Sequence, residues 1–190
     1  MGGWRDVPYF KHKLIMQKKT IVIIIILGAL SLLAFLGYKV ITKTQEKANI
    51  SKQLQTIPEF EFMTLEEALF SNKNLKPNLP TIFIYFNSEC DFCQHEAQTI
   101  SDHIDKFNAV QFVFVSTEPI ETIRQFSELY NLNHQQNITF SHDKTHLFSS
   151  RFDATSIPYI LIYDSNQKLL KKHKGQLNAN GILKVLDQND

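Results

Sequence analysis

The only two cysteines of the chain stand three residues apart, as Cys90-Asp91-Phe92-Cys93, at a predicted junction between a strand and a helix. An apolar run from Thr81 to Phe86 precedes them, and a segment with apolar residues at helical spacing follows. The first turn of a helix has unpaired backbone N–H groups and the positive end of the helix dipole, and both stabilise a thiolate. This arrangement predicts an α/β fold in which Cys90 and Cys93 form a reactive dithiol.

Two other roles for the cysteine pair stay open at this point. A disulfide that only stabilises the domain would close a very short loop, which removes little conformational entropy from the unfolded chain. A zinc site would combine the pair with His95, or with His142 and His146, but the sequence has no second Cys-x-x-Cys pair to complete a structural site. We therefore expect no metal and no other cofactor.

A long apolar segment lies near the N-terminus. From Ile21 to Tyr38 the sequence has no charged residue, and a helix of this length spans about 27 Å, close to the roughly 30 Å of a hydrocarbon core. A cleaved signal peptide is the alternative, but its apolar core is usually shorter and small residues follow it, whereas Tyr38-Lys39-Val40-Ile41-Thr42-Lys43 follows here. The sequence therefore favours an uncleaved transmembrane anchor at residues 21–38.

The distribution of charge predicts the orientation of this anchor. Five basic residues precede the apolar segment, while three lysines follow it closely with Glu46 among them. The basic residues before it are Arg5, Lys11, Lys13, Lys18 and Lys19, and those after it are Lys39, Lys43 and Lys47. Residues 51–190 contain twelve Lys or Arg and seventeen acids. By the positive-inside rule, residues 1–20 form a cytoplasmic basic N-terminus, which predicts a single-pass protein of the inner cell membrane with a periplasmic C-terminal domain. An acidic outer domain argues against nucleic acid as a partner, because phosphates require a basic surface. Both Met1 and Met16 are plausible starts.

The remainder of the chain is expected to form a polar tether, residues 39–56, and one domain, residues 57–190. Strands are expected at residues 60–62 (an edge strand), 81–86, 110–115, 138–140, 159–163 and 168–173, the last two as a hairpin. One helix is expected after the cysteines, because apolar residues recur there at helical spacing and form one face: Phe92, Cys93, Ala97, Ile100, Ile104 and Phe107. Further helices are expected at residues 119–130, 144–152 and 178–186. This order predicts a mixed sheet covered by helices on both faces.

Three segments resemble the thioredoxin superfamily. They are the strand, Cys90-x-x-Cys93 and helix, the segment Ser156-Ile157-Pro158-Tyr159 that leads into a strand, and the hairpin that ends at Gly175. More narrowly, residues 57–188 resemble the membrane-anchored, extracytoplasmic thiol–disulfide oxidoreductases of the bacterial TlpA/ResA type. Ile157-Pro158 falls where that family has a cis-proline loop beside the dithiol. The resemblance implies a thioredoxin-like mixed β-sheet flanked by helices.

The resemblance also implies a function. It points to a reductant that receives electrons from a membrane partner and acts on exported proteins, such as the haem-binding cysteines of apocytochrome c. From their positions in the helix, Cys90 is expected to be the exposed nucleophile and Cys93 the buried resolving thiol. The backbone edge at Ile157 and Pro158 is expected to bind an extended substrate as an added strand.

Some positions depart from the family pattern. Asp91-Phe92 stands between the cysteines where thioredoxin has Gly-Pro, and Ile84 occupies the position of the buried acid of thioredoxin. The proton-handling acid that thioredoxin has at this position is therefore expected to be missing. Glu89 and Asp91 oppose thiolate formation at Cys90 by charge repulsion, and His95 either points back to the site or faces solvent.

Two other functions belong to different classes. A non-catalytic thioredoxin-fold module would hold a client protein at the Ile157-Pro158 edge without exchanging disulfides. A peroxidase of the peroxiredoxin type would need Pro and Thr in its Pro-x-x-x-Thr-x-x-Cys signature, where this chain has Phe83 and Asn87. The sequence therefore argues against the peroxidase, and Cys90→Ser separates the remaining two hypotheses.

Overall fold

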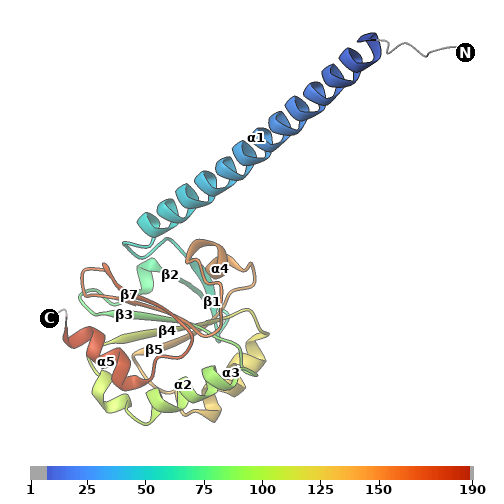
Figure 1. Cartoon of the computed structure of the whole chain (residues 1–190). Coiled ribbons are helices and arrows are strands. Elements are labelled where there is room, and N and C mark those ends of the chain that lie inside the picture. Colours follow the sequence, from blue (N-terminus) through green and yellow to red (C-terminus); the bar gives the residue numbers. More distant parts are fainter. Residues whose placement is uncertain (1–7, 189–190) are drawn as a thin grey trace, which may run out of the picture. The chain divides into compact units, whose positions relative to one another are not determined.

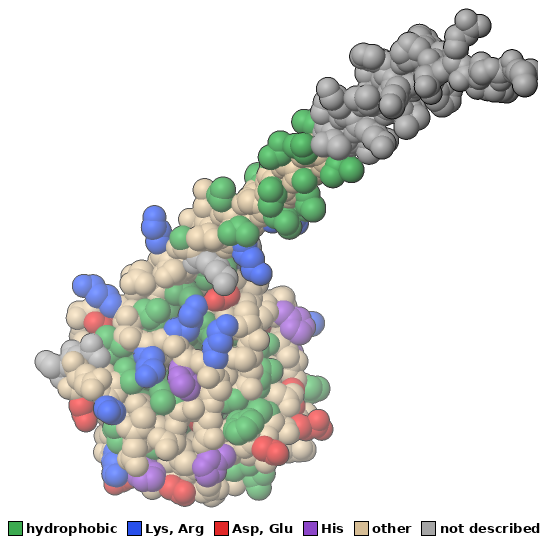
Figure 2. All heavy atoms as spheres, viewed as in Figure 1, with side chains coloured by type: hydrophobic (Ala, Val, Ile, Leu, Met, Phe, Trp, Pro, Cys, Tyr) green, Lys and Arg blue, Asp and Glu red, His purple; other side chains and the backbone are tan. Residues whose placement is uncertain are grey.

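The computed structural model describes residues 8–188, with side chains at residues 25–45 and 48–188. The chain divides into two compact units, Met1–Asn49 and Ile50–Asp190. The first is made of the long helix α1 (Pro8–Gln53), which continues into the start of the second. Within α1, the segment Ile25–Gln53 is long and apolar enough to cross a membrane, with a mean hydropathy of 2.0 in its most apolar window. Figure 2 shows apolar side chains exposed along this helix.

Two predictions, the basic N-terminal segment and the tether, concern residues outside the predicted domain. The basic segment, residues 1–20, lies outside the residues whose side chains are described. The tether, residues 39–56, is helical as far as Gln53, because it contains no Gly or Pro before Pro58 to interrupt α1. Leu54 is already part of a buried apolar cluster, so the packed domain begins slightly upstream of residue 57.

The second unit is built on a seven-stranded mixed sheet with the strand order β2-β1-β5-β4-β3-β6-β7 (Figure 1). The strands are β1 (Glu61–Thr64), β2 (Leu69–Ser71), β3 (Thr81–Tyr85), β4 (Gln111–Ser116), β5 (Ile138–His142), β6 (Tyr159–Tyr163) and β7 (Leu169–Lys174). β4 pairs in parallel with both β3 and β5, and the other pairs are antiparallel. The predicted thioredoxin-like mixed sheet is confirmed. The prediction that residues 60–62 form an edge strand is wrong, because β2 pairs with β1 and takes the edge.

Helices cover both faces of the sheet, as predicted. α2 (Asp91–Ser101), α3 (Ile120–Leu129) and α5 (Ala179–Asp187) pack on one face, and α4 (Leu147–Arg151) packs on the other (Figure 1). Along β3 the side chains alternate: Ile82 and Ile84 join the first core, while Phe83 and Tyr85 join the second. Because the central strands are buried on both sides, their sequences are nearly continuous apolar runs.

The helix that follows the cysteines differs from its prediction in two ways. α2 ends at Ser101, and a separate 3₁₀ helix, η2 (Ile104–Phe107), follows after a turn. A second 3₁₀ helix, η1 (Asn72–Asn74), follows β2. Phe92, predicted on the apolar face, is 63% exposed, whereas Cys93, the next residue of the same turn, is buried in the core.

Candidate active site

The loop between β3 and α2 places Cys90 at the start of the helix. Cys90 is the N-cap residue with an extended backbone (φ −83°, ψ 113°), and its carbonyl accepts hydrogen bonds from the amides of Cys93 (2.9 Å) and Gln94 (3.0 Å). The amides of Asp91 and Phe92, the first two of the helix, donate to no residue in the described part of the chain. Unpaired amides and the positive end of the helix dipole thus lie beside Cys90, at the start of α2.

The two cysteines differ in exposure and are not joined by a disulfide in this structure. Cys90 is partly exposed, whereas Cys93 is 2% exposed. Burial raises the pKa of the Cys93 thiol, and the neighbouring Cys90 and Glu96 add to the rise, while a backbone interaction with Asn87 opposes it. Cys93 therefore holds its proton more tightly than an ordinary thiol, and Cys90 is the sulfur that a large substrate can reach.

The proline loop lies beside Cys90. The peptide bond between Ile157 and Pro158 is cis, and the Cys90 Sγ is 3.9 Å from the Ile157 carbonyl oxygen. The carbonyl of buried Pro158 accepts a hydrogen bond from the amide of Gly175 (2.9 Å), whose φ of +88° favours glycine. The Ile157 amide donates to no other described residue, and the Ile157 side chain is 42% exposed. The structure thus brings the proline loop and the dithiol together.

A buried carboxyl group that the sequence analysis did not assign lies one turn after Cys93. Glu96 is 0% exposed, and neither of its oxygens has a hydrogen-bond partner in the described part of the chain. Burial raises the pKa of Glu96 well above 4.5 and the charge of Cys90 adds to this, while the backbone at Leu177 is close enough to oppose it. Ile84 carries no acid, so the position of the buried acid of thioredoxin is apolar here, and Glu96 is a buried carboxyl at a different position. The position three residues after Cys93, on the buried helical face, was the available signal.

A second carboxyl group, Glu118, holds the loop that leads to Cys90. Its Oε2 accepts hydrogen bonds from the Ser88 amide (2.8 Å) and the Ser116 hydroxyl (3.0 Å), and its Oε1 accepts one from the Ser88 hydroxyl (2.6 Å). The Gln94 side chain donates to the Ser88 carbonyl (2.8 Å). Ser88 is therefore tied both to the end of β4 and to α2. No sequence pattern reveals this contact, because it joins residues 30 positions apart.

The remaining predicted ligands do not gather at the dithiol. His95 lies on the exposed side of α2, so it faces solvent rather than the site. Within the described residues, no group of three or more His, Cys, Asp or Glu side chains is arranged to hold a metal ion.

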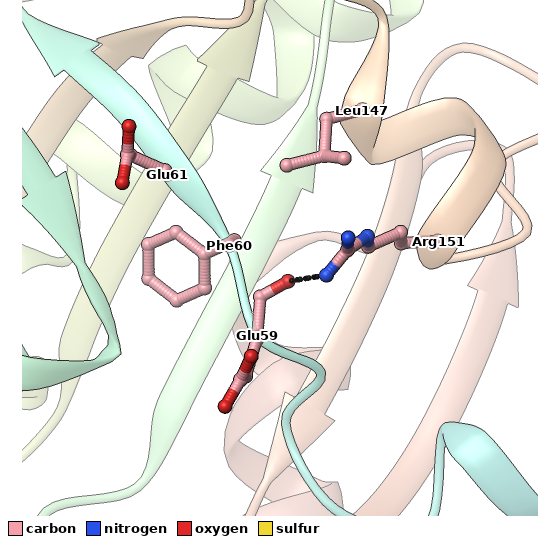
Figure 3. Close-up of a pocket in the computed structure, with 5 residues that line it drawn as sticks. All are labelled: Glu59, Phe60, Glu61, Leu147 and Arg151. Atoms are coloured by element: carbon pink, nitrogen blue, oxygen red, sulfur yellow. Dashed lines mark hydrogen bonds between the residues drawn. The ribbon is translucent and has the colours of Figure 1, made fainter.

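A polar hollow of about 220 Å³ lies on the other face of the sheet, between the segment before β1 and α4, and Figure 3 shows the residues that line it. Arg151 reaches across from α4 and donates to the Glu59 carbonyl (3.1 Å), and Glu61 and Leu147 also line the hollow. None of the predicted site residues belongs to it. It is therefore separate from the dithiol site.

Solved structures that resemble this chain include DsbF, a secreted disulfide oxidoreductase and a peroxidoxin. DsbF from MTB is 20% identical, with 72% of this chain and 96% of that chain covered and a TM-score of 0.60. A secreted Mycobacterium tuberculosis disulfide oxidoreductase homologous to E. coli DsbE is 23% identical, with 70% and 96% covered and a TM-score of 0.57. The peroxidoxin BcpB from Mycobacterium tuberculosis is 16% identical, with 71% and 96% covered and a TM-score of 0.61. At these identities the likeness establishes the fold.

The amino-acid sequence identifies the family of this chain. No curated protein matches the chain. A family model does match residues 54–172, which include both cysteines, Glu96 and the proline loop. This match covers more than half of the chain, so the protein belongs to the AhpC/TSA family.

Proposed function

We propose that this protein is a membrane-anchored thiol–disulfide oxidoreductase that reacts through Cys90 and Cys93. The arrangement of the pair carries the proposal: a partly exposed thiol at the start of α2 and a buried thiol one turn later, with the proline loop 3.9 Å from the first sulfur. Membership of the AhpC/TSA family and the thioredoxin-like fold support redox chemistry at thiols in general.

In the proposed reaction, the Cys90 thiolate attacks one sulfur of a substrate disulfide, and a mixed disulfide forms while the first substrate thiolate leaves. Cys93 then attacks the Cys90 sulfur, which closes the Cys90–Cys93 disulfide and releases the second substrate thiolate. The protein loses two electrons and two protons, and the substrate gains two electrons and takes up two protons as its thiolates protonate.

The second step requires that Cys93 lose its proton, and Glu96 is the buried group placed to take it. The charge of Cys90 raises the pKa of both Cys93 and Glu96. Formation of the mixed disulfide removes that charge, so both groups ionise more readily at the moment when Cys93 must attack. Once Glu96 has released its own proton to water, its carboxylate is a stronger base than an ordinary one, because its pKa is raised, and it accepts the Cys93 proton.

The substrate is proposed to bind as an extended segment along the proline loop. The amide of Ile157 has no partner in the described part of the chain, and its carbonyl contacts only the Cys90 sulfur. An added strand would pair with these two groups and bring its own sulfur to Cys90. Pro158 has no N–H, so the backbone groups of Ile157 are the ones that would pair with the substrate.

The proposal also covers the direction of electron transfer and the location of the thioredoxin-like domain in the cell. The resemblance to TlpA/ResA-type proteins favours a reductant that serves exported proteins and receives electrons from a membrane partner. The apolar segment of α1 and the excess of basic residues before it support a single-pass anchor with the thioredoxin-like domain outside the cytoplasm. Protease added to spheroplasts, whose inner membrane is sealed and right side out, should cleave the domain if this orientation holds.

The test uses the full chain in a non-ionic detergent, with a fluorescent disulfide peptide and dithiothreitol as the electron source. Turnover should require Cys90, so Cys90→Ser abolishes it, while Cys93→Ser should accumulate a mixed disulfide on Cys90. Peptide binding without turnover by the wild type would instead indicate a non-catalytic binding module. Turnover of hydrogen peroxide in preference to the peptide would indicate a peroxidase, despite Phe83 and Asn87 in its signature positions.

A further inference from the structure

The residues around Cys90 form an exposed border that the fold itself does not use. We define the dithiol rim as Glu89, Asp91, Phe92 and Ile157, all of which are exposed and adjoin Cys90 in the sequence or through the proline loop. The rim combines two carboxylates with two apolar side chains. We propose that the dithiol rim selects substrate segments with a positive charge and an apolar side chain next to their cysteine, an inference that rests on the proposed function.

Phe92 carries the apolar part of this inference. Every other phenylalanine of the Ile50–Asp190 unit is at most 7% exposed, whereas Phe92 is 63% exposed. A large aromatic side chain left in water contributes little to folding, yet it offers apolar area to a partner. Ile157, the residue whose carbonyl faces Cys90, adds a second exposed apolar side chain. A substrate that brings its sulfur to Cys90 therefore contacts apolar surface beside that sulfur.

The charged side chains around Cys90 support the proposed preference for a positively charged substrate. Glu89 and Asp91 flank Cys90 and form no ion pair with any described residue. A third carboxylate, Glu118, is hydrogen-bonded to the loop two residues before Cys90. The sequence has no Lys or Arg between Lys76 and Lys106.

One cation does contact the proline loop. Lys174 donates to the Thr155 hydroxyl (2.7 Å), two residues before Ile157. The three carboxylates of Glu89, Asp91 and Glu118 outnumber this cation, so we infer that an approaching substrate meets a negative potential on balance. Cationic segments should therefore be favoured and acidic segments repelled.

The size of this preference follows from distance. Disulfide exchange brings the two sulfurs into contact, so residues beside the substrate cysteine come within about 5–10 Å of both flanking carboxylates. A peptide with Lys beside its cysteine should then react about tenfold faster than one with Glu at about 20 mM salt, and less than about twofold faster at 1 M salt. Contact with Phe92 should favour Leu over Ser at the next position by about fivefold.

The experiment follows the reduced full chain in a non-ionic detergent by stopped-flow absorbance. Four peptides contain one cysteine as a mixed disulfide with nitrothiobenzoate, and their neighbouring residues combine Lys or Glu with Leu or Ser. Each protein dithiol that becomes a Cys90–Cys93 disulfide releases one peptide thiol and one coloured thiolate, so the colour reports the exchange. The ratio between peptides is the measurement, because a change in Cys90 reactivity alters all four rates alike.

Matched variants separate the rim from general surface effects. Glu89→Gln combined with Asp91→Asn should reduce the Lys-to-Glu ratio below about twofold, and Phe92→Ala should bring the Leu-to-Ser ratio near one. Glu128→Gln and Leu129→Ala remove an exposed acid and an exposed apolar side chain at the far end of α3, and should leave both ratios unchanged. Equal rates for all four peptides with the wild type, or ratios that persist in the rim variants, would overturn the inference alone. A wild type that reacts with no peptide would overturn the proposed function as well.

Discussion

Glu96→Gln is the substitution that tests the buried part of the site most sharply. Both carboxyl oxygens of Glu96 are buried without a hydrogen-bond partner in the described part of the chain, and burial raises its pKa well above 4.5. In the unfolded chain the same carboxyl is hydrated and titrates near its ordinary value. Between these two pKa values, folding takes up a proton, so the stability of the wild type depends on pH in a way that the variant does not share.

The sign and slope of this dependence are fixed by linkage. Below pH 4.5 the carboxyl is protonated in both states, so the wild type retains its full stability there. As the pH rises above this value, the contribution of Glu96 to the free energy of unfolding falls by about 1.4 kcal/mol per pH unit, until the folded-state pKa is passed. Glutamine has nearly the same size and no titration. Its buried amide adds a cost of about 1–3 kcal/mol that does not vary with pH.

The assay is urea unfolding of the reduced Ile50–Asp190 unit, followed by circular dichroism from about pH 4 to about pH 8. The stability of Glu96→Gln relative to the wild type should rise at about 1.4 kcal/mol per pH unit and then level off. Glu128→Gln, which removes an exposed carboxyl, should give a nearly flat difference. A flat difference for Glu96→Gln as well would show that this carboxyl is hydrated or paired, and would refute the assignment of Glu96 to proton handling.

Three further predictions concern the loop and its surroundings. Iodoacetamide should modify Cys90 and spare buried Cys93 in the native reduced protein, as read by mass spectrometry of digested samples, and equal labelling would contradict the assigned roles. Glu118→Gln weakens the bonds to Ser88 and should lower the free energy of unfolding by about 1–2 kcal/mol; an unchanged urea midpoint would show that the loop is held by other contacts. Asp143→Ala removes the carboxylate that accepts the first two amides of α4 and should cost about 2–3 kcal/mol, whereas a loss below about 0.5 kcal/mol would rule out a capping role.

The central strands could be predicted because burial on both faces leaves a strong signal. β3, β4 and β6 are nearly continuous runs of apolar residues, and the β6–β7 hairpin has a clear turn. β2 has only three residues, and its Leu69 is exposed, so neither length nor alternation marks it. The break after Ser101 was also invisible, because Ile104 and Phe107 keep an apolar spacing that suits a continuous helix as well as two short ones.

The site was predictable only in part, for a related reason. Spacing and context identify Cys90 and Cys93, and the order of elements brings Ile157 and Pro158 to them. Helical periodicity shows which face of a helix is apolar, but it does not show where neighbouring elements stop covering that face, so Phe92 was assigned to the core. It also gives no reason to bury a charged residue, although Glu96 lies on the buried face.

The equilibrium reduction potential of the Cys90–Cys93 pair in the full chain tests the central claim most directly. Glutathione or dithiothreitol buffers would set the ambient potential, and the fraction of free thiol would be measured by alkylation and mass spectrometry. A disulfide-exchanging reductant should show one two-electron transition with a midpoint near or below about −250 mV. A midpoint of about −120 mV would contradict the reducing direction, since that value is typical of a strong oxidant. The absence of any two-electron transition would contradict disulfide exchange itself.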